Sequence, residues 1–131
     1  DQYRRLRNTF RYLLGALDGF SEAERVGPAE MPELERWALH RLSEIDTELK
    51  RAVGDYDFNA YSSTLVAFAN NDLSAFLFDI RKDSLYCDAV DSPKRRAYRS
   101  LLAILFDALT KWLAPVLVFT AEEAWAAAGN G

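Results

Sequence analysis

Hydrophobic side chains recur every three or four positions along almost the whole chain, which is the spacing of one face of an α-helix. No segment of strand length alternates strictly between apolar and polar positions. The pattern therefore predicts an all-α protein. Four stripes carry this prediction: Tyr3, Leu6, Phe10, Leu13 and Leu17; Leu34, Ala38, Leu42, Ile45, Leu49 and Val53; Phe58, Tyr61, Leu65 and Phe68; and Tyr98, Leu102, Leu105, Leu109 and Trp112.

Turn and capping residues divide this pattern into substantial helices joined by short connections. Gly19 is placed to end the first helix and Gly54 the second, while Asp57 can cap the third. Ser92-Pro93 is an N-cap followed by a proline in the first turn, which opens the fourth. The order of elements predicts an antiparallel helical bundle of four to five main helices, forming a single domain over residues 1–131.

Three places in the pattern are less regular. The apolar spacing hesitates around Asn70-Asn71-Asp72, and residues 81–91 are polar enough to form a loop between helices. Pro115 should kink or stop the fourth long helix, because proline cannot donate the helical hydrogen bond. Thr120 with Glu123 then forms a capping box that would open a short final helix.

The length and composition fit one domain with a large hydrophobic core, since 50% of the 131 residues are hydrophobic. The single Cys87 excludes an internal disulfide and a cysteine-cluster metal site. No apolar run reaches the ~18 residues of a membrane helix, and DQYRRLRN is not a signal peptide. The chain lacks an initiating methionine, so we expect a domain cut from a longer protein. We also expect it to be monomeric and to have no membrane partner.

Positive charge is concentrated in the first helix although the formal net charge is −4. At about 100° per residue, Arg4, Arg7 and Arg11 fall within about 60° of one another, beside the apolar stripe. Asn8 lies next to them, and Tyr3 borders the same face. Like charges at this spacing repel by a few tenths of a kcal/mol per pair unless an anion lies against them.

Three interpretations of this basic face remain open from charge pattern alone. The arginines can form a solvated face that pairs with acids of a neighbouring helix, such as Glu33 or Glu44. Alternatively, guanidinium groups at this spacing can bind the phosphates or base edges of a nucleic acid. A helical module whose basic face docks an acidic protein belongs to the same set of alternatives.

Two further basic segments follow later in the chain. Arg81 and Lys82, with Tyr86 nearby, could meet single-stranded nucleotides by phosphate contact and stacking. A second cluster lies at the start of the fourth long helix, where the helix dipole disfavours cations. This hints at an external anion, although Asp88 and Asp91 are close enough to offset the charge. The members of this cluster are Lys94, Arg95, Arg96 and Arg99.

Catalytic chemistry finds no support in the sequence. His40 is the only histidine, so no catalytic triad or metal-ligand cluster can be assembled around it. Glu122 and Glu123 are adjacent on a helix and point about 100° apart, so we interpret them as capping acids. We therefore expect no catalytic residue, no metal ligand and no cofactor in this chain.

Five segments, in order, give the chain a resemblance to the anticodon-binding domain of bacterial isoleucyl-tRNA synthetases, a class I aminoacyl-tRNA synthetase family. RNTFRYLL together with FDIRKDSLY points to isoleucine, whereas LAPVLVFTAEEAW is shared by related enzymes. The equivalent domain of a valyl-, leucyl- or methionyl-tRNA synthetase is therefore the alternative. The segments are YRRLRNTFRYLLGAL, LERWALHRL, YDFNAYSSTL, DLSAFLFDIRKDSLYCD and RRAYRSLLAILFDALTKWLAPVLVFTAEEAW.

The resemblance implies that the parent protein is a cytoplasmic isoleucine–tRNA ligase, which uses ATP and Mg²⁺ to esterify its cognate tRNA. Its catalytic domain, its editing domain and a zinc-bearing C-terminal region would lie elsewhere in that protein. The signatures His-x-Gly-His and Lys-Met-Ser-Lys-Ser of the catalytic domain do not occur here. The chain should therefore be inactive alone and should have tRNA and the catalytic domain of the same protein as its partners.

Residue by residue, the resemblance implies a tRNA-binding site on the first helix and around the later basic pair. Arg7 and Asn8 match the Arg-Asn pair that faces the anticodon in related synthetases, and their neighbours share or border that face. Ser84 stands where many relatives have arginine, so one phosphate contact is missing. The complete expected set is Tyr3, Arg4, Arg7, Asn8, Arg11, Arg81 and Lys82.

Overall fold

The predicted all-α architecture is confirmed by a computed structural model, which describes the backbone of residues 2–127 and the side chains of residues 4–116. Between α2 and α5 the chain forms one continuous helical rod, because α3 runs through a π-helical segment, η3, into α4. The elements are α1 (Gln2–Ala16), η1 (Glu22–Glu24), η2 (Pro28–Glu30), α2 (Glu33–Gly54), α3 (Phe58–Ala67), η3 (Phe68–Phe78), α4 (Asp79–Cys87) and α5 (Pro93–Ala127).

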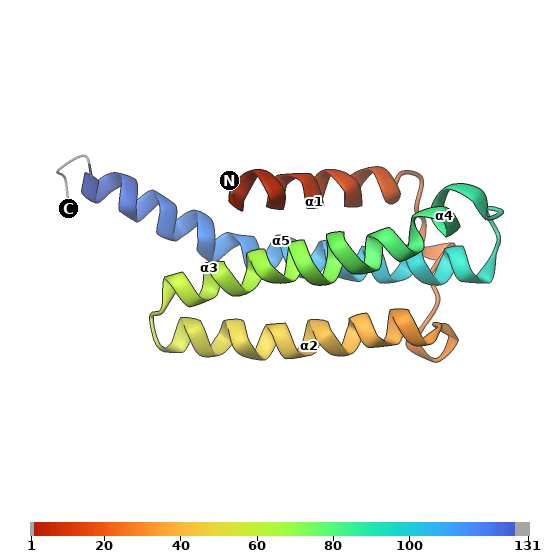
Figure 1. Cartoon of the computed structure of the whole chain (residues 1–131), viewed down its shortest axis with the longest axis horizontal. Coiled ribbons are helices and arrows are strands. Elements are labelled where there is room, and N and C mark those ends of the chain that lie inside the picture. The colour runs from red at the N-terminus through yellow and green to blue at the C-terminus, as the bar shows by residue number, and fades with distance from the viewer. Residues whose placement is uncertain (1, 128–131) are drawn as a thin grey trace.

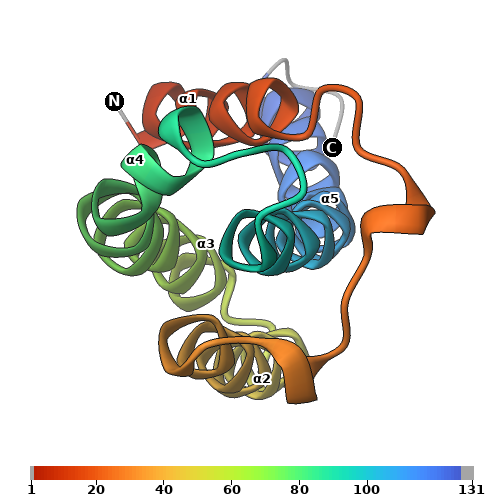
Figure 2. The same cartoon turned by 90° about the vertical axis from the view of Figure 1, so that its right-hand side faces the viewer.

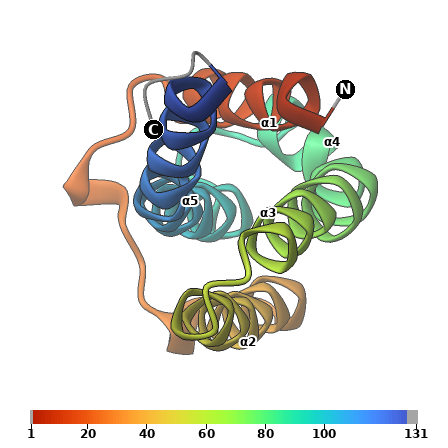
Figure 3. The same ribbon diagram turned by 90° about the vertical axis from the view of Figure 1, so that its left-hand side faces the viewer.

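Successive helical rods run in opposite directions, as expected for an antiparallel bundle (Figure 1). Viewed along the bundle, α1 and α2 lie on opposite sides, with α3 and α4 between them on one flank (Figures 2 and 3). Helix α5 packs against α1, α2, α3 and α4, so it is the central element of the fold. The surfaces of α1 and α2 consequently face different parts of the solvent.

The core is built around the apolar stripe of α5 that the sequence predicts. Leu102, Leu105 and Leu109 are fully buried, and burying a leucine of this kind stabilises a fold by about 1.5–3 kcal/mol. Trp112, at the end of the stripe, is also buried, and its indole N–H donates to Asp46 of α2 at 3.2 Å. Its interpretation as a core residue is therefore confirmed.

Near residues 70–72, where the apolar spacing is irregular, the helix changes its pitch but does not break. Leu65, Ala69, Leu73 and Leu77 are spaced by four and are all fully buried. In an α-helix of 3.6 residues per turn, such positions would drift by about 40° at each step. The wider turns of the 11-residue π-helix η3 keep them on one face.

The expected loop at residues 81–91 is wrong for its first half, because α4 extends to Cys87. Leu85 and Ser84 are buried in this helix and anchor it on the bundle, although most of its other residues are polar. The connection to α5 is limited to residues 88–92. Arg81 and Lys82 therefore lie on consecutive positions of a helix and point in directions about 100° apart.

Pro115 does not stop α5, so the expected separate final helix is also wrong. The helix continues to Ala127, and Figure 1 shows it changing direction in its C-terminal half. Pro115 has no N–H for the carbonyl of Lys111, which explains a local bend. At this bend the Tyr61 hydroxyl donates to the Trp112 carbonyl at 2.6 Å. The side chains of Thr120 and Glu123 lie outside the described residues.

The predicted helix boundaries hold at several caps. Asp57 accepts a hydrogen bond from the Ala60 N–H at 3.0 Å at the start of α3. Gly19, just beyond α1, has a φ of +74°, a left-handed conformation that glycine adopts without strain. Ser21 precedes η1 but makes no side-chain cap. Glu24, three residues after Ser21, binds Arg99 of α5 with its carboxylate.

Candidate nucleic-acid interface

The basic face of α1 is held in solvent by the burial of the opposite face. Leu6 and Leu13 are buried in the core, and Phe10 packs edge-on against Phe106 of α5 with ring centroids 5.9 Å apart. These contacts fix the rotation of the helix about its axis. The four residues on the opposite side are all exposed: Arg4, Arg7, Asn8 and Arg11.

No described acid neutralises these arginines. Among the side chains of residues 4–116, no ion pair or side-chain hydrogen bond involves Arg4, Arg7 or Arg11. Glu44, one of the partners we expected, instead binds Arg41 at 3.6 Å and His40 at 3.8 Å. The other, Glu33, starts α2 on the opposite side of the bundle from α1 (Figure 2). The expected pairing with either acid is therefore wrong.

The side chain of Tyr3 lies outside the described residues, although its backbone belongs to α1. It stays a predicted member of the interface. With this exception, the structure places every expected residue of the first helix on one exposed and uncompensated face.

Arg81 occupies a different environment from the other expected site residues. Its Nε and Nη2 donate to the two carboxylate oxygens of Glu35 at 2.8 and 2.9 Å, a bidentate pair that joins α4 to α2. The Glu35 side chain is 0% exposed and that of Arg81 is 12% exposed. The structure thus gives Arg81 a buried ion pair, and its direct contact with tRNA stays a prediction.

Lys82 is on the exposed side of the same helix, with 58% of its side chain accessible. Its only close acid among the described residues is Asp79, at 3.5 Å and itself exposed, which is a weak surface pair. Phe78, one turn earlier, stacks on Tyr12 of α1 with ring centroids 4.1 Å apart. Lys82 follows Phe78 by one helical turn and therefore lies toward the edge of α4 next to α1. Figure 2 shows the ribbon of α4 beside that of α1.

The second basic cluster, at the start of α5, is used inside the molecule. Arg99 donates to the carbonyls of Ala16 and Asp18 and to the carboxylate of Glu24, at 3.1, 2.6 and 2.6 Å. The two carbonyls lie at the end of α1, where backbone carbonyls otherwise lack donors, and Glu24 belongs to η1. The expected external anion is therefore replaced, for Arg99, by internal acceptors.

Its neighbours in this cluster follow the same principle. Arg95 donates to the Leu85 carbonyl at 3.1 Å near the end of α4. Arg96 donates to the carbonyls of Ala23 and Glu24, both at 3.2 Å. Lys94, the remaining member of the cluster, is exposed and makes no hydrogen bond or ion pair with the described side chains. The cluster thus connects α5 to the ends of α1 and α4 and does not form a binding face.

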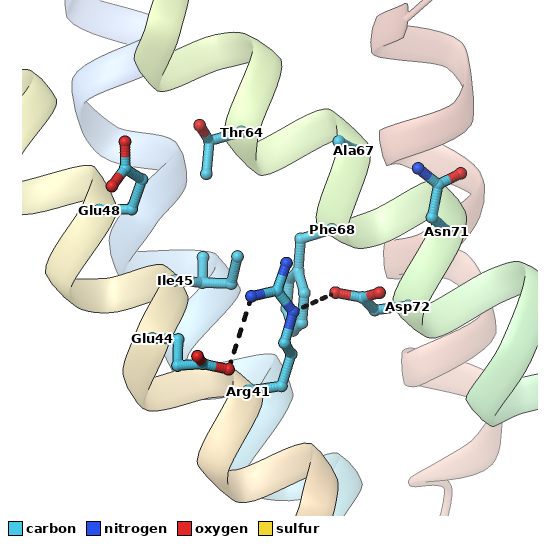
Figure 4. A pocket seen from close by; sticks show the side chains of 9 residues that line it. All are labelled: Arg41, Glu44, Ile45, Glu48, Thr64, Ala67, Phe68, Asn71 and Asp72. Atoms are coloured by element: carbon cyan, nitrogen blue, oxygen red, sulfur yellow. Dashed lines mark hydrogen bonds and ion pairs between the residues drawn. The ribbon is translucent and has the colours of Figure 1, made fainter.

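A polar cleft of about 450 Å³ lies between α2 and the rod formed by α3 and η3 (Figure 4). Arg41 crosses this cleft and binds Asp72 at 2.8 Å and Glu44 at 3.6 Å. Its charged groups are thus paired with one another. The one hydroxyl of its lining, on Thr64, makes no hydrogen bond to a carboxylate, which is the arrangement that an activated nucleophile uses.

Among the described side chains, those of residues 4–116, no group of three or more His, Cys, Asp or Glu could hold a metal ion. Within residues 2–127 no helix is long and apolar enough to cross a membrane. His40 is exposed, with Glu44 as its closest charged neighbour.

Comparison with known proteins identifies the family to which this all-α bundle is similar. The family model "Anticodon-binding domain of tRNA ligase" matches residues 35–131. Isoleucine–tRNA ligase of Zymomonas mobilis is 57% identical over 130 residues, which cover 95% of this chain and 14% of that protein. The same enzyme of Ruegeria pomeroyi is 56% identical over 126 residues, covering 95% of this chain and 13% of the relative.

The isoleucine–tRNA ligase of Caulobacter vibrioides gives a similar match, at 55% identity over 126 residues. The chain belongs to the family of anticodon-binding domains of tRNA ligases. Its similarity is to isoleucine–tRNA ligases, of whose length it spans 13% to 14%. The family model begins after α1, but the alignment with the relative covers 95% of the chain. Even if every unaligned residue lay at the N-terminus, more than half of α1 would be aligned.

Sequence analysis missed the partner of Arg81, although the sequence contains a signal for it. Glu35 falls on the apolar stripe of α2, three residues before Ala38 and seven before Leu42. A carboxylate on a buried helix face needs a cationic partner, because an unpaired buried charge is strongly unfavourable. The identity of that partner was not available from the spacing, since Arg81 lies 46 positions away.

Proposed function

We propose that this chain binds the anticodon stem-loop of isoleucine tRNA, as part of an isoleucine–tRNA ligase. The observation that carries this proposal is the exposed face of Arg4, Arg7 and Arg11, which has no acid partner among the described side chains of a protein with net charge −4. A concentrated and unpaired cationic face is the arrangement that a polyanion stabilises. Lys82 extends this face onto α4.

The proposed roles of the side chains follow from their chemistry. The three arginines of α1 bind phosphate oxygens with their planar forks, and this sets the position of the RNA. Asn8 lies among them and offers an amide that can both donate to and accept from a base edge. Lys82 neutralises a further phosphate, and Tyr3 borders the face. Arg81 supports the interface by fixing α4 against α2 through Glu35.

Binding at this domain would contribute to aminoacylation at a distance. The parent enzyme would use ATP with Mg²⁺ in a catalytic domain of the same protein, and any zinc would belong to another of its regions. Interaction energy gained at the anticodon stem-loop holds the tRNA so that its acceptor end is correctly placed. Discrimination between isoleucine and valine requires the amino-acid pocket and the editing site, and therefore does not depend on this chain. A cytoplasmic location and a monomeric state of the isolated chain belong to the same proposal.

The test is binding of the 131-residue chain to isoleucine tRNA, valine tRNA and an unrelated tRNA across a salt series. Affinity should fall as salt rises, because cations on the protein replace counterions on the RNA. Arg7→Gln should weaken binding to every tRNA that the chain binds and reduce the salt slope by about one, because it removes one phosphate contact. Arg36→Gln is the matched control, because Arg36 is an exposed arginine on α2, on the other side of the bundle.

Three outcomes decide the proposal. Tightest binding to isoleucine tRNA, lost in Arg7→Gln and kept in Arg36→Gln, supports it. Tightest binding to valine tRNA assigns the domain to the related synthetase. Absence of salt-dependent binding by the folded chain, checked by circular dichroism, contradicts an RNA-binding role.

A further inference from the structure

The last turn of α4 presents a large aromatic side chain to the solvent. Tyr86 is 75% exposed and lies four residues after Lys82. Residues at this spacing are neighbours on one helix face, with Cβ atoms about 5–6 Å apart. A lysine ammonium and a phenol ring are therefore presented side by side.

This pair lies on the edge of α4 that faces the basic helix α1. Phe78, Lys82 and Tyr86 follow one another at intervals of four, and Phe78 stacks on Tyr12 of α1 at 4.1 Å. The Tyr12 hydroxyl is bonded to that of Tyr98 at 2.8 Å. Burial raises the pKa of Tyr12, and its hydrogen bond to Tyr98 acts in the opposite direction.

The environment of Tyr86 differs from that of the other strongly exposed tyrosine. Tyr56 is 82% exposed in the turn after α2, at the far end of the bundle from α4 (Figure 1). That region carries acids at Asp55 and Asp57. Tyr86, in contrast, lies one helical turn after Lys82 in α4, and the ribbon of α4 lies on the same side of the bundle as α1 (Figure 2). Exposed rings interleaved with cations are the arrangement that binds single-stranded nucleotides.

We propose that Tyr86 is a stacking platform for one unpaired base of the anticodon loop, while Lys82 neutralises an adjacent phosphate. This inference rests on the proposed function and names the part of the RNA that meets α4. Loop bases are unstacked on at least one face and can lie on an aromatic ring, which bases inside a duplex cannot do. The hydroxyl of Tyr86 has no role in stacking, so phenylalanine should replace it.

The experiment measures the affinity of the 131-residue chain for an anticodon stem-loop RNA of isoleucine tRNA. Tyr86→Leu should weaken binding about 5- to 150-fold, the range for loss of one base–aromatic stack. Tyr86→Phe should bind within about twofold of wild type by the same reasoning. Tyr56→Leu removes an equally exposed tyrosine from the far end and should bind as wild type does.

Two further measurements separate stacking from charge. The salt slope should be unchanged in Tyr86→Leu, because no cation is lost, whereas Lys82→Gln should reduce it by about one. Loop bases are then replaced one at a time by abasic sites. At the stacked position the abasic site should weaken wild type and have no further effect on Tyr86→Leu.

Unchanged affinity of Tyr86→Leu, with binding weakened in Arg7→Gln, would overturn the stacking role and leave the proposed function standing. A loss in Tyr86→Leu that is equal for every abasic RNA would also overturn it. Absence of RNA binding by the wild-type chain would remove the proposed function itself. Folding of each variant is checked by circular dichroism, and the exposure of Tyr86 predicts no change.

Discussion

Replacing Arg81 by methionine removes one half of a buried ion pair and leaves Glu35 without a partner. Methionine has a similar length and no charge, so packing along the side chain is largely kept. The 0% exposure of Glu35 means that water cannot replace the two lost hydrogen bonds. The substitution therefore isolates the energy of an uncompensated buried carboxylate.

The expected loss in free energy of unfolding is about 3–5 kcal/mol, the usual cost of removing one partner from a buried pair. Glu35 lies in the first turn of α2, where the helix dipole stabilises negative charge by up to about 1 kcal/mol. The expected loss in free energy of unfolding is therefore about 3 kcal/mol, at the lower end of this range. The whole fold is stabilised by about 5–15 kcal/mol, so the variant should remain folded but weakened.

Urea denaturation followed by circular dichroism measures this loss. With a slope of about 1–3 kcal/mol per molar urea, the midpoint should fall by about 1–3 M. The double variant Glu35→Leu, Arg81→Met should recover most of the loss, because an apolar pair of this kind is often as stable as the ion pair. Lys82→Gln is the neighbouring control and should stay within about 0.5 kcal/mol of wild type.

A midpoint for Arg81→Met within about 0.3 M of wild type, at an unchanged slope, would refute the interpretation of the pair as a structural link. The folded double variant also tests the predicted contact of Arg81 with tRNA. If its RNA affinity equals that of wild type, Arg81 acts only through the position of α4. If its affinity is lower, Arg81 contacts the RNA directly.

Three further substitutions test the core, an internal cap and a buried phenol. Leu105→Ala should lower the free energy of unfolding by about 2–5 kcal/mol in urea denaturation, since Leu105 is fully buried in α5. Arg99→Met should cost about 1–3 kcal/mol and speed amide exchange in the last turn of α1, because the Ala16 carbonyl loses its donor. Burial raises the pKa of Tyr61 to about 12, while the unfolded phenol titrates near 10. Wild-type stability should therefore fall as pH rises from about 10 to 12, by up to about 1.4 kcal/mol per pH unit, and Tyr61→Phe should lack this component in urea titrations at each pH.

The fold class and much of the core could be predicted because they depend on local spacing. The stripe Leu102, Leu105 and Leu109 alone identifies the buried face of α5, and the structure buries all three. The cap at Asp57 is equally local, since its acceptor and donor are three residues apart. The exposed basic face of α1 follows from the same geometry, because its rotation is set by Leu6 and Leu13.

The remaining features depend on residues that are far apart in the sequence. The partners of Arg99 lie 75 to 83 positions away, so its position at a helix N-terminus suggested an external anion. Arg81 and Glu35 are 46 positions apart, so the sequence did not show that Arg81 forms a buried ion pair while Lys82 is exposed. The π-helix was visible only as a hesitation, because periodicity analysis assumes a fixed pitch.

The most direct test of the account compares two triple variants of equal net charge. The first is Arg4→Gln, Arg7→Gln, Arg11→Gln on the basic face of α1. The second is Arg36→Gln, Lys50→Gln, Lys111→Gln, which removes three exposed cations from α2 and α5. Two of these, Lys50 and Lys111, are in exposed surface ion pairs, so little stability should be lost.

The measurement is the salt slope of affinity for isoleucine tRNA. If the α1 face binds phosphates, the first variant should lose about 2–3 from the magnitude of the slope, at about 0.7–0.9 for each cation removed. The second should keep a slope close to that of wild type. Equal slopes for the two folded variants would contradict the central claim, because they would show that net charge, and not the face of α1, governs binding.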